Sequence, residues 1–305
     1  MGKASRRARQ AERAQSPSVP AAPFVARPFE GLAGETDIVA MREIVPAATA
    51  TLTLRTDAEP LREAATVGGG EVPETLELVT VLPMAWPGLH RGDGTYLLGL
   101  QSGSHTGDYS RDTAHVLLEL LRTPAGSPAR PTTVANASTP RLQDLVVAEA
   151  PMPVTMHETF EFWFAPGADL DGEAGASLQE TNEAIIPTTK LTSTDSAYWC
   201  RVGDRTHLRW LQPHDEDAAT DALARLVAAG EASLGEGTRL LGAFRACGLL
   251  VPVWDLDPRF EADAYEDAAA DMAARFAEAA ADGGPLTPEE RRARGGLLSR
   301  QLTLR

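Results

Sequence analysis

The sequence has 305 residues, of which 43% are apolar and 23% charged, and this composition is that of an ordinary globular protein. The length is enough for about two domains. It contains no apolar run near the ~20 residues that a membrane helix needs, and no apolar segment follows its basic N-terminus as in a secretory signal, so we expect a cytoplasmic protein without membrane contact. The two cysteines, Cys200 and Cys247, lack a Cys-x-x-Cys spacing, which argues against a disulfide framework and a zinc site built on thiolates.

Charge is distributed unevenly along the chain. The formal net charge is −15, whereas residues 1–15 carry five basic side chains and one acidic side chain. An acidic body does not offer the basic face that a duplex-binding domain needs. Residues 1–23 lack apolar periodicity and end in a proline-rich run, so we predict a disordered basic tail. We interpret this tail as solvated; the alternative is contact with RNA, the ribosome or an acidic protein surface through Arg6, Arg7, Arg9 and Arg13.

The first expected unit covers residues 24–165. Its sequence predicts a helix at 38–45 that ends at Pro46, and strands at 50–55 and 74–83. The rest of this unit is predicted, in chain order, as a turn at 92–94 that closes a hairpin with a second strand at 96–100, a helix at 113–122 preceded by Asp112, a loop at 123–140, a helical turn at 142–147 and a half-buried strand at 154–164.

A second, more compact unit is expected at 166–260, after an acidic and glycine-rich loop at 165–179. Its predicted elements are strands at 199–202 and 206–211, a helix preceded by Asp217, a helix at 238–246 closed by Gly248, and a strand at 249–254 in which Pro252 indicates an edge strand. Residues 261–305 are predicted as a helical C-terminal extension, with a helix at 262–281 and a second helix that begins at Thr287 with a capping-box spacing to Glu290. We interpret this extension as packed on the body; docking to a partner is the alternative.

An internal similarity supports the two units. Residues 92–101 and 203–212 agree at six of ten positions without a gap, and an apolar helix preceded by aspartate is expected after each copy. The similarity predicts a duplication, which concerns architecture and assigns no activity.

The richest polar cluster falls in one loop-rich stretch of the first unit. Its members are His90, Asp93, His105, Asp108, Asp112 and His115. These side chains are of the types that bind zinc or a hard cation, and a histidine among them could act as a general base. We interpret them as solvated loop residues, with a metal site or a His/Asp active site as the alternative, because their spacing does not imply that they converge.

Nucleotide and cofactor motifs are missing from the sequence. The lysines are Lys3 in the tail and Lys190 after two threonines, so no Gly-Lys loop exists to hold phosphates, and no Gly-x-Gly-x-x-Gly opens a helix after a strand. We therefore expect no P-loop nucleotide and no cofactor.

Four segments carry a resemblance to a known family. They are residues 24–32, 39–50, 237–246 and 248–256. With them the chain resembles an uncharacterised actinobacterial family, a domain of unknown function that covers nearly the whole chain beyond the tail. Residues 222–253 are also similar to the helix-helix-strand segment of the SseB family of bacterial accessory proteins, and this local likeness implies an α+β interaction fold.

Together these observations predict an α+β protein of two related units, with mainly antiparallel sheets packed by helices and a helical C-terminal arm. The leading hypothesis is a non-enzymatic interaction or accessory protein with a protein partner. The alternatives are a metal-dependent or His/Asp enzyme that uses the loop from His90 to His115, and an RNA- or ribosome-associated protein that uses the tail together with Arg291, Arg292, Arg294 and Arg300.

Overall fold

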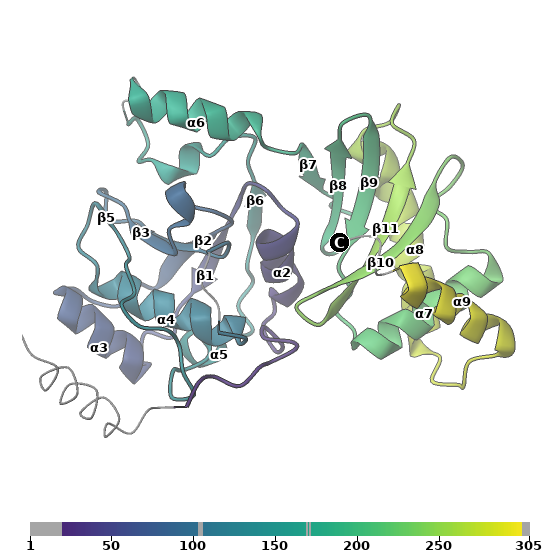
Figure 1. The fold of residues 1–305 in the computed structure, drawn as a ribbon, viewed down its shortest axis with the longest axis horizontal. Coiled ribbons are helices and arrows are strands. Elements are labelled where there is room, and N and C mark those ends of the chain that lie inside the picture. The colour runs from purple at the N-terminus through teal and green to yellow at the C-terminus, as the bar shows by residue number, and fades with distance from the viewer. Residues whose placement is uncertain (1–19, 103–105, 169, 171, 301–305) are drawn as a thin grey trace, which may run out of the picture.

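The computed structural model describes residues 20–102, 106–168, 170 and 172–300. The candidate residues Arg6, Arg7, Arg9, Arg13 and His105 lie outside the described residues. The chain has an α+β fold in which two sheets, each packed by helices, form two lobes that lie side by side (Figure 1). No helix in the described part of the chain combines the length and the apolar character that a membrane crossing needs.

The first lobe contains a six-stranded sheet with the order β5-β3-β4-β2-β1-β6. Its strands are β1 Ala48–Thr53, β2 Thr75–Val79, β3 Gly88–His90, β4 Tyr96–Gly99, β5 Ser127–Pro128 and β6 Val154–Met156. Neighbouring strands run antiparallel, except that β2 and β4 run parallel. The turn at 92–94 therefore closes a hairpin whose first strand is the short β3, and β2 is not the hairpin partner of β4.

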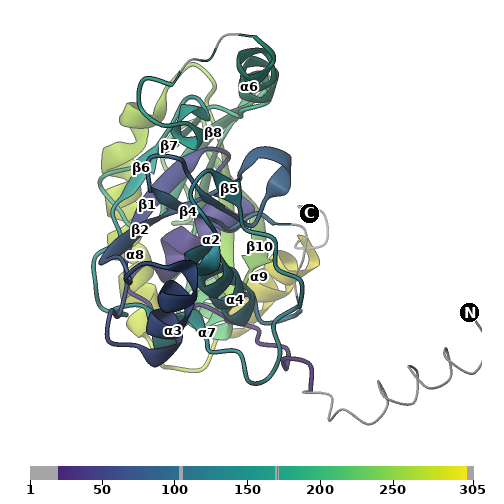
Figure 2. The same cartoon turned by 90° about the vertical axis from the view of Figure 1, so that its left-hand side faces the viewer.

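Helices cover both faces of the first sheet. The core of one face includes α3 Glu59–Gly68, α4 Tyr109–Arg122 and α5 Leu142–Leu145, and the core of the other face includes the short helix η2 Glu161–Trp163 and α6 Glu173–Glu183. In Figure 2, α3 and α4 lie together, and α6 lies at the opposite end of the view. The alternation of β4 explains this arrangement, because Leu98 packs with α4 while Leu97 packs with Trp163 and Leu178.

The second lobe is built on a five-stranded antiparallel sheet with the order β10-β11-β9-β8-β7. Its strands are β7 Thr188–Lys190, β8 Ala197–Val202, β9 Arg205–Trp210, β10 Arg239–Ala246 and β11 Leu249–Leu256. The helices of this lobe are α7 Glu216–Ala229, the short η3 Ala262–Tyr265, α8 Glu266–Ala281 and α9 Pro288–Arg300. Three tryptophans of the sheet and Phe276 of α8 are buried in one core between sheet and helices, namely Trp199, Trp210 and Trp254.

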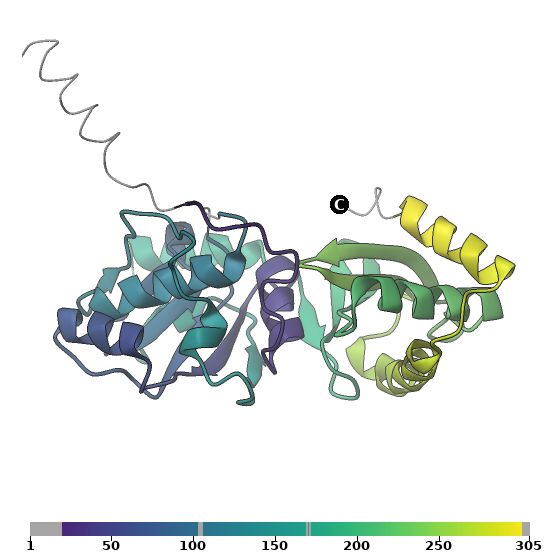
Figure 3. The same ribbon diagram turned by 90° about the horizontal axis from the view of Figure 1, so that it is seen from below.

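The helix α2, Glu35–Glu43, lies between the two lobes (Figure 3). Asp37 of this helix accepts hydrogen bonds from Lys190 Nζ at 2.6 Å, Ser196 Oγ at 2.7 Å and Tyr198 OH at 2.8 Å. The buried core of the first lobe also continues into the second sheet through Tyr198 and Val251. Both polar bonds and apolar packing therefore join the lobes.

Both copies of the internal similarity lie at β-hairpins. The first copy spans the turn between β3 and β4, and the second spans the turn between β8 and β9. The sheets around them differ, since only the first contains a parallel strand pair. The duplication and the division into units stay predictions.

Three predictions in the second half of the chain are wrong. Residues 238–246, predicted as a helix, form the strand β10, which pairs with β11 along its length. Pro252 is not on an edge strand, because β11 pairs with both β10 and β9; its missing N–H is accommodated because the β9 ladder begins at the next residue, Val253. The loop predicted at 165–179 contains the first part of α6.

Two further corrections concern the first half and the helix caps. The strand predicted at 154–164 ends at Met156, because Phe160 and Trp163 leave the strand direction and stack on each other at 4.7 Å between ring centroids. Helix α4 begins four residues earlier than predicted and is capped by Asp108, not Asp112. In the same way Asp215, not Asp217, caps α7.

Candidate functional site

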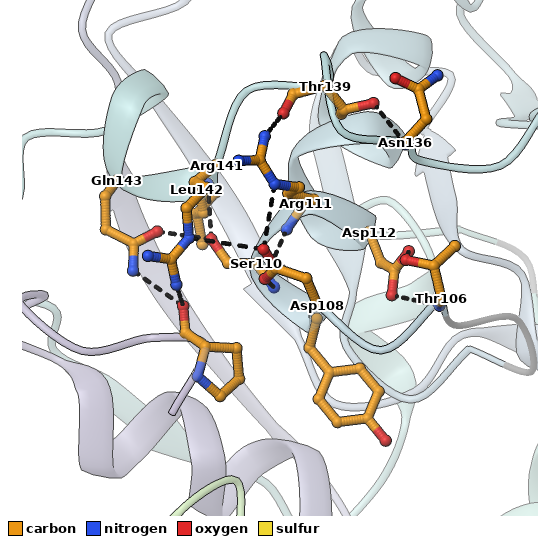
Figure 4. A network of polar contacts seen from close by, with 12 residues as sticks. Thr106, Asp108, Ser110, Arg111, Asp112, Asn136, Thr139, Arg141, Leu142 and Gln143 are labelled. Carbon is orange, nitrogen blue, oxygen red and sulfur yellow. Dashed lines mark hydrogen bonds and ion pairs between the residues drawn. The ribbon is translucent and has the colours of Figure 1, made fainter. Parts of the chain in front are cut away.

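Asp108 is the centre of a buried polar network at the N-terminus of α4 (Figure 4). Its side chain is 1% exposed, and its Oδ1 accepts a hydrogen bond from the backbone N–H of Ser110 at 3.1 Å. Its Oδ2 lies 3.2 Å from Nε of Arg111 and 3.7 Å from Nε of Arg141. The carboxylate thus caps the helix and balances two guanidinium groups at the same time.

The network connects α4 to segments that are distant in the sequence. Arg111 donates from Nη1 to the carbonyl of Thr139, and Arg141 donates from Nη2 to the carbonyl of Pro28 at 2.6 Å. Ser110 Oγ accepts from the N–H of Leu142 at 2.8 Å. Because these three contacts end on the backbone of other segments, the Asp108 network ties the start of α4 to Pro28, Thr139 and Leu142.

Two of the six candidate residues between His90 and His115, namely Asp112 and His115, form hydrogen bonds to loops beside this network. Asp112 accepts hydrogen bonds from the backbone N–H and the Oγ1 of Thr106, at 2.9 and 2.8 Å. His115, one turn further along α4, has Nε2 3.0 Å from the carbonyl oxygen of Thr133. These contacts fix the chain on both sides of α4.

His90 and Asp93 are engaged elsewhere. His90 lies on β3, where Nδ1 is 2.6 Å from the carbonyl oxygen of Thr123 and the ring stacks on Tyr96. Asp93 is bonded to Arg91, which holds the pKa of that carboxyl well below its ordinary value. Within the residues that the structure describes, no three His, Cys, Asp or Glu side chains are placed so that they could hold a metal ion.

A cavity of about 1070 Å³ lies between α4 and residues 129–136. Its apolar wall includes Ala85, Trp86, Pro87, Val116 and Val134. Its polar wall includes Ser102, Thr106, Asp112, His115 and Arg130. The structure thus brings Asp112 and His115 together at one cavity. Asp108, at the N-terminus of α4, is not among the lining residues.

Large apolar side chains are exposed in the lining of this cavity or close to its lining residues. Val134 lines the cavity and is 60% exposed, and Met84, the neighbour of the lining residue Ala85, is 86% exposed. Phe24 is 80% exposed and packs beside Gly107, which follows the lining residue Thr106. We call Phe24, Met84 and Val134 the apolar rim. Exposed apolar side chains grouped around a concavity mark interaction surfaces.

The wall of the cavity also contains a strained turn. Met84 and Ala85 adopt φ angles of 55° and 54°, in the left-handed region that favours glycine. Two hydrogen bonds hold the turn, from Ala85 N–H to Leu82 O and from Trp86 N–H to Pro83 O, both at 3.0 Å. Strain of this kind costs ~1–3 kcal/mol per residue and gathers at functional surfaces.

Arg130 is the cation of this cavity. It is exposed, and its guanidinium contacts no other described residue through a hydrogen bond or an ion pair. The preceding residue, Ala129, is held in place by a hydrogen bond from its N–H to the carbonyl oxygen of Gly88 at 2.8 Å. The arginines of the nearby network, Arg111 and Arg141, are by contrast engaged.

Sequence reasoning did not single out Arg130, Trp86 or Val134. The segment 123–140 has no apolar periodicity and was predicted as a loop, and it is indeed mostly irregular. It is placed by long-range contacts, such as the bridge between Ala21 and Asn136, which carry no local signal.

Arg291, Arg292, Arg294 and Lys190 form hydrogen bonds or ion pairs within the fold. Arg294 bonds to Asp217 and Asp221 of α7, both at 2.6 Å, and Arg292 pairs with Glu289. The capping box between Thr287 and Glu290 is present. Lys190 is bound to Asp37.

Comparison with known proteins places the chain in a family but not in an activity. No curated protein and no solved structure matches the chain. A family model described as a family of unknown function, DUF5926, matches residues 28–305, which is nearly the whole chain and includes both sheets. The chain therefore belongs to the family of unknown function DUF5926.

Proposed function

We propose that this protein is a non-enzymatic interaction protein and that its partner binds in the cavity between α4 and residues 129–136. The observation that carries the proposal is the combination of a cavity of about 1070 Å³ with an apolar rim of three exposed side chains, Phe24, Met84 and Val134. Large exposed apolar side chains are costly to keep in water, and grouped ones are typical of surfaces that a partner covers.

The strained turn supports the same proposal. Met84 and Ala85 keep an unfavourable backbone conformation in which Met84 is 86% exposed while Ala85 and Trp86 line the cavity. Backbone strain of this kind clusters at ligand and partner sites, so the strained turn supports a binding role for this wall.

The titratable side chains of the cavity have structural hydrogen bonds. Both oxygens of Asp112 accept hydrogen bonds from Thr106, and His115 Nε2 lies 3.0 Å from the carbonyl oxygen of Thr133. These bonds give both side chains of α4 a role in holding the loops of the proposed binding surface.

The test is quantitative affinity purification of the tagged full-length chain from its own cells, with two variants in parallel. Val134→Asp places a charge on the apolar rim, and Val67→Asp places the same charge on an equally exposed valine of α3. We expect a near-stoichiometric partner with the wild type and with Val67→Asp, and at least a tenfold loss with Val134→Asp.

Equal recovery of the partner by both variants would contradict the proposal, because the rim would then not be the contact. RNA that copurifies with both variants and is lost when residues 1–23 are removed would instead support the alternative role of the tail.

A further inference from the structure

We propose that the occupant of the cavity is an acidic protein segment, which places an apolar side chain against Trp86 and a carboxylate on Arg130. This inference rests on the proposed function and names the class of partner.

The charge of the partner is inferred from Arg130. Arg130 lines the cavity and is exposed, and its guanidinium contacts no other described residue through a hydrogen bond or an ion pair. Arginine binds carboxylates through two parallel hydrogen bonds, and such charge-assisted pairs are about twice as strong as neutral ones. The acid of the same cavity, Asp112, is satisfied by Thr106 and does not pair with Arg130.

The position of the N-terminal segment adds to this charge. Ala21 forms a bridge with Asn136, and Ala137 donates to the carbonyl of Pro20 at 3.0 Å, so the chain enters the fold at the edge of the cavity. Residues 1–15 carry five basic side chains and one acidic one, in a chain whose formal net charge is −15. Along the sequence, these basic residues precede the segment at Pro20 and Ala21 that meets the edge of the cavity, and their charge suits an acidic partner.

The size and exposure of the cavity favour a segment of protein over a small molecule. Pockets for small ligands measure ~300–1,000 Å³ and enclose most of the ligand. This cavity, at about 1070 Å³, is slightly larger than that range, and its lining residue Val134 remains 60% exposed. An apolar side chain inside the cavity and a flanking backbone across the rim would cover both regions.

Selection of peptides tests the inference directly. A library of random twelve-residue peptides is selected by display on the immobilised full-length chain, and the best peptides are measured by fluorescence anisotropy. We expect enriched peptides to combine net negative charge with at least one large apolar residue. Their affinity should fall at least tenfold for Arg130→Glu and for Val134→Asp.

The matched controls are Arg62→Glu and Val67→Asp, which change an exposed arginine and an exposed valine on α3. Both should bind within twofold of the wild type. Circular dichroism and the urea midpoint of each variant show that it is folded.

The outcomes separate the two proposals. Peptides that lose affinity for Val134→Asp, but are neutral or basic and bind Arg130→Glu normally, would overturn the acidic class alone. Peptides that bind Val134→Asp as well as the wild type would overturn the cavity as the binding site. A selection that enriches no peptide would overturn a protein segment as the occupant.

Discussion

At the level of single residues, the most consequential group is the carboxylate of Asp108. It is 1% exposed, caps α4 and lies between the guanidinium groups of Arg111 and Arg141. Removing one partner of a buried charge cluster leaves the others uncompensated in a region of low dielectric. Asp108→Ala should therefore lower the free energy of unfolding by about 3–5 kcal/mol, measured by urea denaturation.

The control for this prediction is Asp57→Ala, which removes a carboxylate that is 81% exposed and 3.9 Å from Arg55. Exposed pairs of this kind contribute little, so the change should stay within about 1 kcal/mol. Equal effects of the two substitutions would show that Asp108 is not a structural charge.

Two histidines make stability depend on pH. Burial lowers the pKa of His157 and of His207 below the ordinary value, in spite of the neighbouring carboxylates Glu77 and Asp255. The unfolded chain therefore binds protons at a higher pH than the native one, and stability falls as the pH drops from ordinary histidine values through the native pKa.

The urea midpoint should consequently decrease between pH 7.5 and pH 5.5, above the range in which ordinary carboxylates titrate. In the double variant His157→Gln and His207→Gln this decrease should become smaller. An unchanged pH dependence in the double variant would contradict the assignment to these two side chains.

At the level of elements, local sequence patterns predicted helices α4, α7, α8 and α9 and the hairpins β3–β4 and β8–β9, but not the hairpin β10–β11. The turn at 92–94, the strands at 199–202 and 206–211 and the helix at 262–281 all correspond to elements of the structure. Each has a strong local signal, either glycine and aspartate at a turn or a clear period over many residues.

The errors occur where tertiary contacts decide between alternatives. Residues 240–244 are apolar without a clean period, and pairing with β11 makes them a strand. The sequence pointed to Asp112 at the start of α4, whereas the cap is Asp108, which also pairs with Arg111 and with the sequence-distant Arg141. Most of the candidate site was not predictable for the same reason, since contacts across the fold place residues 129–136.

The hairpin between β10 and β11 offers a test at this level. Gly248 has a φ of +79°, and a Cβ on it would lie 2.7 Å from the carbonyl oxygen of Ala26, which is backbone and cannot move away cheaply. Gly248→Ala should cost about 3 kcal/mol, the sum of left-handed strain and overlap.

Gly94 is the matched control, because its φ is +88° but a Cβ on it would meet no atom within 4 Å. Gly94→Ala should cost about 1 kcal/mol from strain alone. The free energies of unfolding of both variants are measured by thermal or urea denaturation. If Gly248→Ala is no less stable than Gly94→Ala, the hairpin does not pack against Ala26.

At the level of the whole molecule, the two lobes are joined through α2. Asp37 accepts three hydrogen bonds from the second lobe, one of them from the ammonium group of Lys190. Asp37→Ala leaves these donors without their acceptor and should lower the free energy of unfolding by about 2–3 kcal/mol. Asp195→Ala, which alters an exposed aspartate in the second lobe, is the control and should have little effect. Similar losses in both variants would contradict the role of Asp37 at the junction.

The central claim is that a partner covers the cavity. The claim therefore predicts contact at the cavity and not at the surface of α3. The most direct measurement is crosslinking in living cells with a photoreactive amino acid placed at position 134, at the rim, or at position 67, on α3. The account predicts a discrete crosslinked species at position 134 that disappears when Arg130 is replaced by glutamate, and no such species at position 67. Crosslinking of equal strength at both positions, or none at position 134, would contradict the claim.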